Sequence, residues 1–168
     1  MKLSPNFSLE ELCVTSNVAL QGTNLIQAKS FLGPLTILAE TLERIRAFLG
    51  APILIHSGYR CPELNGAIAG SAKTSQHMKG EAADFSCPDK FHQGDEGNRE
   101  LFKALRDYLT TRAVPFGQLI DEGYERSYGT VVWIHFSLGA PWREAARCGQ
   151  LLRMRNGKFE MLGVIQQP

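Results

Sequence analysis

In one stretch of the chain, two kinds of side chain alternate so strictly that the pattern predicts the secondary structure. From Val131 to Leu138 the even-numbered residues are valine, isoleucine, phenylalanine and leucine, whereas Trp133, His135 and Ser137 occupy odd positions. Successive strand residues point to opposite faces of a sheet, so this pattern predicts a strand with one apolar core face. His135 then lies on the other face, beside an indole. The fold must therefore contain a sheet that is covered on one side.

A second periodicity predicts helices. Between Pro34 and Gly50, leucine and isoleucine recur every three or four residues, as on one face of an amphipathic helix that ends at a glycine. The same spacing predicts another long helix over residues 98–112. Ser8 and Glu11 form a capping box, which predicts a short helix near the N-terminus.

The strands and helices together predict the fold class. Strands are expected at residues 52–59, 81–87, 118–122 and 131–138. Residues 150–164 are expected to form a C-terminal hairpin, because Asn156-Gly157 is typical of a type I′ turn. The result is an α+β fold in which helices pack on a mainly antiparallel sheet of about four strands. A length of 168 residues favours a single domain, residues 1–168, with a core at about residues 5–145.

Composition excludes several classes of protein. Eighteen Lys+Arg against seventeen Asp+Glu give a formal charge of +1 without a basic cluster, which argues against a nucleic-acid partner. The four cysteines are widely spaced and are expected to be free and mostly buried. No stretch is apolar enough to cross a membrane, and no signal peptide is visible. We therefore expect a monomer that is synthesised in the cytoplasm and does not insert into membranes.

The densest chemical signal lies between Ser75 and Asp84. His77 precedes Asp84 by seven residues, and alternation puts this aspartate on a strand face with small neighbours. His77, Asp84 and His135 make a plausible three-ligand set for a divalent metal, with a fourth position for water. A bound metal would lower the pKa of that water towards roughly 7. From spacing alone, a strand histidine and a capping aspartate of purely structural importance remain the alternative.

The motifs taken together resemble the zinc D-Ala-D-Ala peptidase family, peptidase family M15. The signature consists of Ser75-x-His77-x-x-Gly80-x-Ala82-x-Asp84, followed downstream by Trp133-Ile134-His135. An arginine-bearing segment precedes it, Ser57-Gly58-Tyr59-Arg60 and then Leu64-Asn65. The small bacterial and phage branch of peptidoglycan hydrolases is resembled by Phe7-Ser8-x-x-Glu11-Leu12 and Gln118-Leu119-Ile120-x-Glu122. The resemblance extends over about residues 5–145, in the expected order.

The resemblance implies a zinc metallopeptidase of the carboxypeptidase or endopeptidase type. Zn²⁺ would be held by His77, Asp84 and His135, and the substrate would be a stem peptide or cross-link of peptidoglycan. Arg60 would pair with a substrate carboxylate or with the developing oxyanion. The further expected substrate-binding residues are Tyr59, Ser75, Gln76 and Trp133. Without a signal peptide, a wall-cutting enzyme needs another route of release, which favours a phage endolysin or a virion-associated lysis enzyme.

One departure from the family pattern concerns the catalytic base. Many members carry a glutamate three residues before the last histidine, but this chain has Val132 there, on the core face. A hydrolytic zinc site needs a group that takes the proton of water and passes it to the leaving amine. Glu122 is the expected base because it matches the acidic residue of the Gln-Leu-Ile-x-Glu motif. Asp121 is the alternative.

Two other functions use similar residues. Two histidines and a carboxylate also form the facial triad of non-haem iron oxygenases, although the gap of seven residues between His77 and Asp84 argues against it. The second alternative is a non-catalytic metal-binding module on the same scaffold, which hedgehog signalling domains resemble. His56 and His92 are expected to be ordinary structural or solvent-exposed histidines, with residues 88–97 as a possible wall of a substrate groove.

Overall fold

The computed structural model describes residues 1–127, 129–139 and 148–166. The predicted core boundary at residue 145 lies outside them. Three short 3₁₀ helices occur, at η1 (Glu11–Cys13), η2 (Lys29–Phe31) and η3 (Gln76–Lys79). The α-helices are α1 (Val18–Ala28), α2 (Leu32–Leu49), α3 (Pro62–Ala67) and α4 (Asp95–Thr111). The strands are β1 (Leu54–Ser57), β2 (Ala82–Ser86), β3 (Phe116–Arg126), β4 (Gly129–Leu138), β5 (Gln150–Arg155) and β6 (Lys158–Val164).

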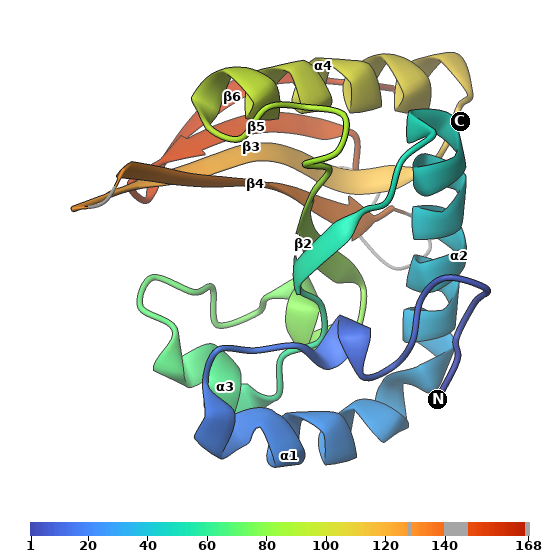
Figure 1. Ribbon diagram of the computed structural model, residues 1–168, viewed down its shortest axis with the longest axis vertical. Coiled ribbons are helices and arrows are strands. Elements are labelled where there is room, and N and C mark those ends of the chain that lie inside the picture. The colour runs from blue at the N-terminus through green and yellow to red at the C-terminus, as the bar shows by residue number, and fades with distance from the viewer. Residues whose placement is uncertain (128, 140–147, 167–168) are drawn as a thin grey trace.

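The strands form one mixed sheet in the order β1-β2-β4-β3-β5-β6. Every neighbouring pair is antiparallel except β3 and β5, which are parallel. Helix α4 lies along one face of this sheet, and α2 stands beside it, with α1 and α3 at the end of the molecule opposite α4 (Figure 1). The α+β class is therefore confirmed.

The prediction of about four strands was wrong in number, because the described residues form a six-stranded sheet. Most strand pairs are antiparallel, as expected, but the parallel pair of β3 and β5 makes the sheet mixed. The C-terminal hairpin is not an appendage, because β5 pairs in parallel with β3 and extends the sheet to six strands. A parallel pair needs a long connection, and hydrophobic periodicity carries no information about which strand a distant segment will join. The hairpin itself is confirmed: Asn156 and Gly157 have φ of +50° and +78°, as a type I′ turn requires.

The alternation along β4 predicts its two faces correctly. Ile134 and Phe136 are fully buried and belong to the same core as Leu101 and Leu105 of α4. Most of the apolar side chains expected on the 34–50 helix are also buried, along α2. The face of the sheet opposite α4 therefore carries the odd-numbered side chains of β4, and His135 is among them.

Helix α1 was not expected, and its sequence explains why. Its Val18 and Ile26 are 85% and 68% exposed, whereas the two residues that it buries completely are polar Asn24 and small Ala28. A helix that turns apolar side chains outward and an amide inward lacks the periodic apolar stripe by which amphipathic helices are found.

The four cysteines agree with the prediction. All four are buried, and Cys13, Cys61 and Cys87 are free thiols. Among the described residues, no helix combines the length and the apolar character that a membrane crossing requires.

Candidate metal centre

Three side chains from separate elements converge at the centre of the molecule. His77 comes from η3, whereas Asp84 and His135 lie directly opposite each other on β2 and β4. Asp84 Oδ1 is 2.8 Å from His135 Nδ1 and 3.3 Å from His77 Nε2, and the two ring nitrogens are 3.2 Å apart. Ligands at zinc bond length around a tetrahedral ion lie about 3.3 Å from one another. The set therefore fits one small cation.

Backbone contacts fix the orientation of His77. The Ser75 hydroxyl accepts a hydrogen bond from His77 N–H and caps η3. His77 Nδ1–H donates to the carbonyl of Gly58 at 2.6 Å, which leaves Nε2 as the lone pair that faces Asp84 and His135. A metal-binding histidine is commonly held by such a bond from its second ring nitrogen.

The electrostatics favour the protonation states that a metal requires. Burial lowers the pKa of His77 and keeps its imidazole neutral. Burial also opposes ionisation of Asp84, but His77 and His135 outweigh it and hold the pKa of this carboxyl well below its usual range. A neutral imidazole beside an ionised carboxylate is the state in which both side chains bind a cation.

Two motif glycines allow this geometry. A Cβ on Gly58 would overlap the backbone carbonyl of Leu12, so only glycine lets the segment that follows β1 pass this close to η1. Gly80 ends η3 at φ +70°, and a Cβ there would also press against Leu35 of α2 at 2.9 Å. Each position thus demands glycine for a packing or backbone reason that the sequence motif alone does not reveal.

The structure separates the two candidate bases. Glu122 pairs with Trp133 across β3 and β4, so its side chain lies on the same sheet face as His135. Asp121 points to the other face, where it is fully buried and accepts hydrogen bonds from Asn98 and two arginines of β5.

The environment of Glu122 raises its pKa to about 7. Burial is the largest cause and repulsion from Asp84 the next, while His135, Arg60 and Trp133 act in the opposite direction. A carboxyl with a pKa near neutrality can both accept and release a proton, which is what a general base and acid must do.

Arg60 lies next to the same group of charges. Its backbone N–H donates to the carbonyl of His77 at 3.1 Å, and its guanidinium interacts electrostatically with Asp84 and Glu122. Burial lowers its pKa and those two carboxylates partly restore it. Arg60 Nε is buried without a hydrogen-bond partner among the residues that the structure describes. An orphaned guanidinium donor beside the metal ligands is suited to an anionic group of a ligand.

The other expected substrate-binding residues have different surroundings. Tyr59 is 1% exposed and its ring contacts Phe31 at 5.1 Å between centroids, so it belongs to the core and has no surface to offer a substrate. Gln76 donates to the carbonyl of Leu138 and to Glu81, which ties η3 to β4. Trp133 stacks on Tyr124, and its buried indole nitrogen has no hydrogen-bond partner among the described residues.

Sequence reasoning missed Asn24 of α1. This fully buried amide accepts a hydrogen bond from Cys61 N–H and donates to the carbonyls of Cys13 and Tyr59. It thereby clamps the residues on both sides of Arg60. An asparagine in an unpredicted helix carries no sequence signal for this role.

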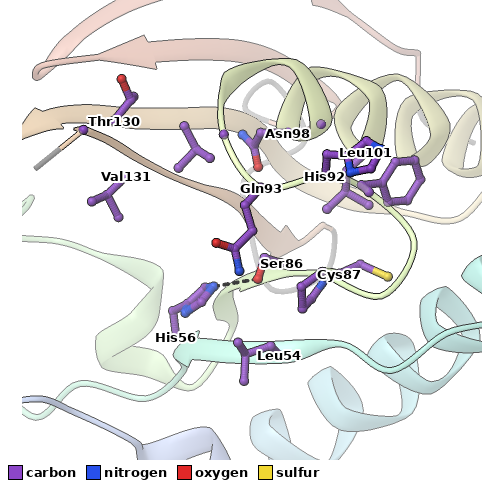
Figure 2. A pocket seen from close by; sticks show the side chains of 16 residues that line it. Leu54, His56, Ser86, Cys87, His92, Gln93, Asn98, Leu101, Thr130 and Val131 are labelled. Carbon is purple, nitrogen blue, oxygen red and sulfur yellow. Dashed lines mark hydrogen bonds between the residues drawn. The ribbon is translucent and has the colours of Figure 1, made fainter.

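A pocket of about 340 Å³ lies beside the metal ligands without including them. His56 and Ser86 line it and form a hydrogen bond of 2.8 Å between Nε2 and Oγ, and Gln93 and His92 of the loop 88–97 line its other side (Figure 2). That loop is therefore one wall of a cavity. His56 and His92 are both exposed and stand apart from the ligand set.

A family model described as Peptidase M15 matches residues 5–109. The matched region includes Arg60, His77 and Asp84, whereas Glu122 and His135 follow it. Neither the comparison with curated proteins nor that with solved structures gives a match.

Proposed function

Because the chain belongs to the peptidase M15 family, we propose that it is a zinc peptidase that cuts a peptide bond in the stem peptide or cross-link of peptidoglycan. The observation that carries this proposal is one sheet face on which Asp84, His135 and Glu122 lie together, with His77 and Arg60 facing them. The donor set of two histidines and one carboxylate is that of a hydrolytic zinc site with an open position.

Each side chain has a distinct task in this reaction. Bound zinc would supply Lewis-acid chemistry, by lowering the pKa of water and polarising the scissile carbonyl. Glu122 takes a proton from the attacking water and returns it to the nitrogen of the leaving amine. The guanidinium of Arg60 donates to the oxyanion as its charge develops, or to a substrate carboxylate. Ser75 and Gln76 hold η3, and so His77, in place.

Digestion of purified peptidoglycan tests this proposal. Zinc-loaded protein should create new peptide termini that mass spectrometry identifies, and Glu122→Gln should lower the rate by about 10²–10⁴-fold while zinc stays bound. Glu125→Gln is the matched control, since Glu125 is an exposed carboxyl on the same strand. Zinc-loaded wild-type protein that yields no new termini would instead support the non-catalytic metal-binding module.

Identifying the bond that is cut distinguishes an endopeptidase from a carboxypeptidase. An endopeptidase that opens cross-links should reduce the turbidity of a cell-wall suspension, as expected of a phage endolysin or a virion-associated lysis enzyme. A carboxypeptidase should release a free terminal amino acid without loss of turbidity. We propose the lytic mode, and release of a free amino acid from intact walls would contradict it.

A further inference from the structure

Strand β4 has a free edge next to the metal centre. Its pairing with β2 covers Ile134 to Ser137 and stops there, because β2 ends at Ser86. On its other side β4 stays paired with β3 as far as Gly129. In the part of the chain that the structure describes, no strand lies beside residues 129–133 on the β2 side.

The hydrogen-bond pattern shows which backbone groups face this free edge. Leu138 N–H donates to the carbonyl of Glu81, so the even-numbered residues of β4 direct their backbone groups towards β2. Antiparallel ladders alternate residue by residue, and the odd-numbered residues accordingly face β3. Val132 and Thr130 therefore direct N–H and C=O into the position of a missing strand.

The pocket of about 340 Å³ opens along the same edge. It is lined by Thr130 and Val132 of β4 and, across from them, by Leu54, His56 and Ser86 of β1 and β2. In Figure 2 the Gln93 side chain extends from the loop towards the hydrogen-bonded His56 and Ser86. None of the described residues that line the pocket is Asp, Glu, Lys or Arg. Such a cavity suits an uncharged occupant that offers amide or hydroxyl groups.

The pocket includes none of the candidate metal ligands, but residues of both lie on the same two strands, β2 and β4. Val132 precedes His135 by three residues on β4, and Ser86 follows Asp84 by two on β2. At the rise of a β-strand, three residues span about 10 Å. A peptide in extended conformation that pairs with Val132 would thus reach the metal ligands within about three of its own residues.

We propose that the substrate peptide binds as an added strand on the free edge of β4 at Thr130–Val132, with an uncharged side chain or amide group in the pocket closed by His56 and Ser86. This inference rests on the proposed function for the identity of the peptide, a peptidoglycan stem. Strand addition supplies affinity through main-chain hydrogen bonds, and the pocket supplies selectivity. Charged groups of the substrate would instead lie towards Arg60 and the metal.

Binding of a soluble disaccharide-pentapeptide from peptidoglycan tests the proposal. The protein is zinc-loaded Glu122→Gln, so that affinity is measured without turnover. Val132→Pro removes an edge N–H that no neighbouring strand uses, and the loss of this donor should weaken binding about tenfold. Leu54→Trp, at a side chain 52% exposed, should fill the pocket and weaken binding by at least as much.

Two variants serve as matched controls. Phe159→Pro introduces proline on β6, at the opposite edge of the sheet. The turn at Asn156-Gly157 and the pairing of Arg155 with Lys158 direct the Phe159 N–H outward, so this substitution also removes an unpaired edge donor. Ile26→Trp adds the same bulk on exposed α1. Both should bind as tightly as the parent, and zinc content and melting temperature show which variants are folded.

Binding measurements test the strand-addition proposal, whereas cleavage by the wild-type protein tests the proposed function. Weakened binding in Val132→Pro and Leu54→Trp, with both controls unchanged, supports strand addition even if the wild-type protein cleaves nothing. Should Val132→Pro lose its zinc, Leu54→Trp decides alone. Equal affinity in all folded variants, or no binding by the parent protein, overturns the proposal, whereas failure of the proposed function would show as absent cleavage by wild type.

Discussion

Asp121 and Glu122 are neighbours on β3 whose side chains point to opposite faces of the sheet. Glu122 shares a face with Trp133 and with two candidate metal ligands, Asp84 and His135. Asp121 is fully buried on the α4 side, with Asn98 Nδ2 at 2.6 Å, Arg155 Nη2 at 2.9 Å and Arg153 Nε at 3.2 Å. Two adjacent acids thus have separate tasks, one in the site and one in the joint between β3, β5 and α4.

Asp121→Asn should destabilise the protein without removing its chemistry. Loss of this buried charge leaves Arg155 with Asp95 and Arg153 with Glu160 as remaining carboxylate partners, and should lower the free energy of unfolding by about 2 kcal/mol in urea denaturation. Zinc content and kcat of the folded fraction should be unchanged. The exposed Asp107→Asn serves as control, with a change below about 0.5 kcal/mol. A hundredfold loss of kcat at unchanged stability would make Asp121 the base.

The pKa of Glu122 makes the stability of the metal-free protein depend on pH. Folding raises this pKa from 4.5 to about 7, so the folded state holds the proton more tightly than the unfolded chain. The contribution of Glu122 to the free energy of unfolding is fully present below pH 4.5 and is lost as the pH rises through about 7. This loss lowers the free energy of unfolding by about 3 kcal/mol. Glu122→Gln should remove this part of the pH dependence in chemical denaturation between pH 4.5 and 8. An unchanged profile would contradict the raised pKa.

Gly58→Ala should weaken zinc binding although Gly58 is not a ligand. The added Cβ overlaps the Leu12 carbonyl, and the displaced Gly58 carbonyl no longer orients His77. Loss of such a supporting bond costs about 10- to 100-fold in metal affinity, measured by competition with a chelating dye. Gly66→Ala is the control, because nothing lies within 4 Å of its Cβ in helix α3 and alanine should stabilise it slightly. Equal zinc affinity in both variants would exclude this role.

Asn24→Ala should reduce both stability and activity. Its amide holds Cys61 N–H at 2.7 Å and two carbonyls at 3.0 Å, all buried, so truncation should cost about 2–4 kcal/mol of unfolding free energy. Release of the segment around Arg60 should also lower kcat/KM at temperatures where the variant is folded. Gln27→Ala on the same helix, which removes a bond to Glu63, should do neither. Full activity in folded Asn24→Ala would show that the clamp is dispensable for Arg60.

Removal of zinc should lower the melting temperature. A ligand at a hundred times its dissociation constant stabilises the folded state by about 2.7 kcal/mol, so a chelator should shift the thermal transition downward and added zinc should restore it. His77→Ala and His135→Ala should show no such response. A zinc-dependent shift that persists in both variants would place the metal elsewhere.

The sequence by itself determined the elements with a strong local period and singled out the three candidate metal ligands. Alternation along residues 131–138 settles which side of β4 carries His135, since the pleat leaves no other choice. The leucine spacing of α2 and the Asn156-Gly157 turn were also predictable, because each depends only on residues close together in the sequence. His77, Asp84 and His135 were singled out because their motifs resemble those of the M15 family, and the structure brings these three side chains together.

Only the tertiary structure decided the rest. The parallel pairing of β3 with β5, the clamp made by Asn24 and the burial of Tyr59 depend on contacts between residues far apart in the chain. Motif reasoning could favour Glu122 over Asp121, but strand register assigns each acid to its face and burial raises the pKa of Glu122. The free edge of β4 arises because β2 is shorter than its neighbour, a difference in length that no residue in either strand records.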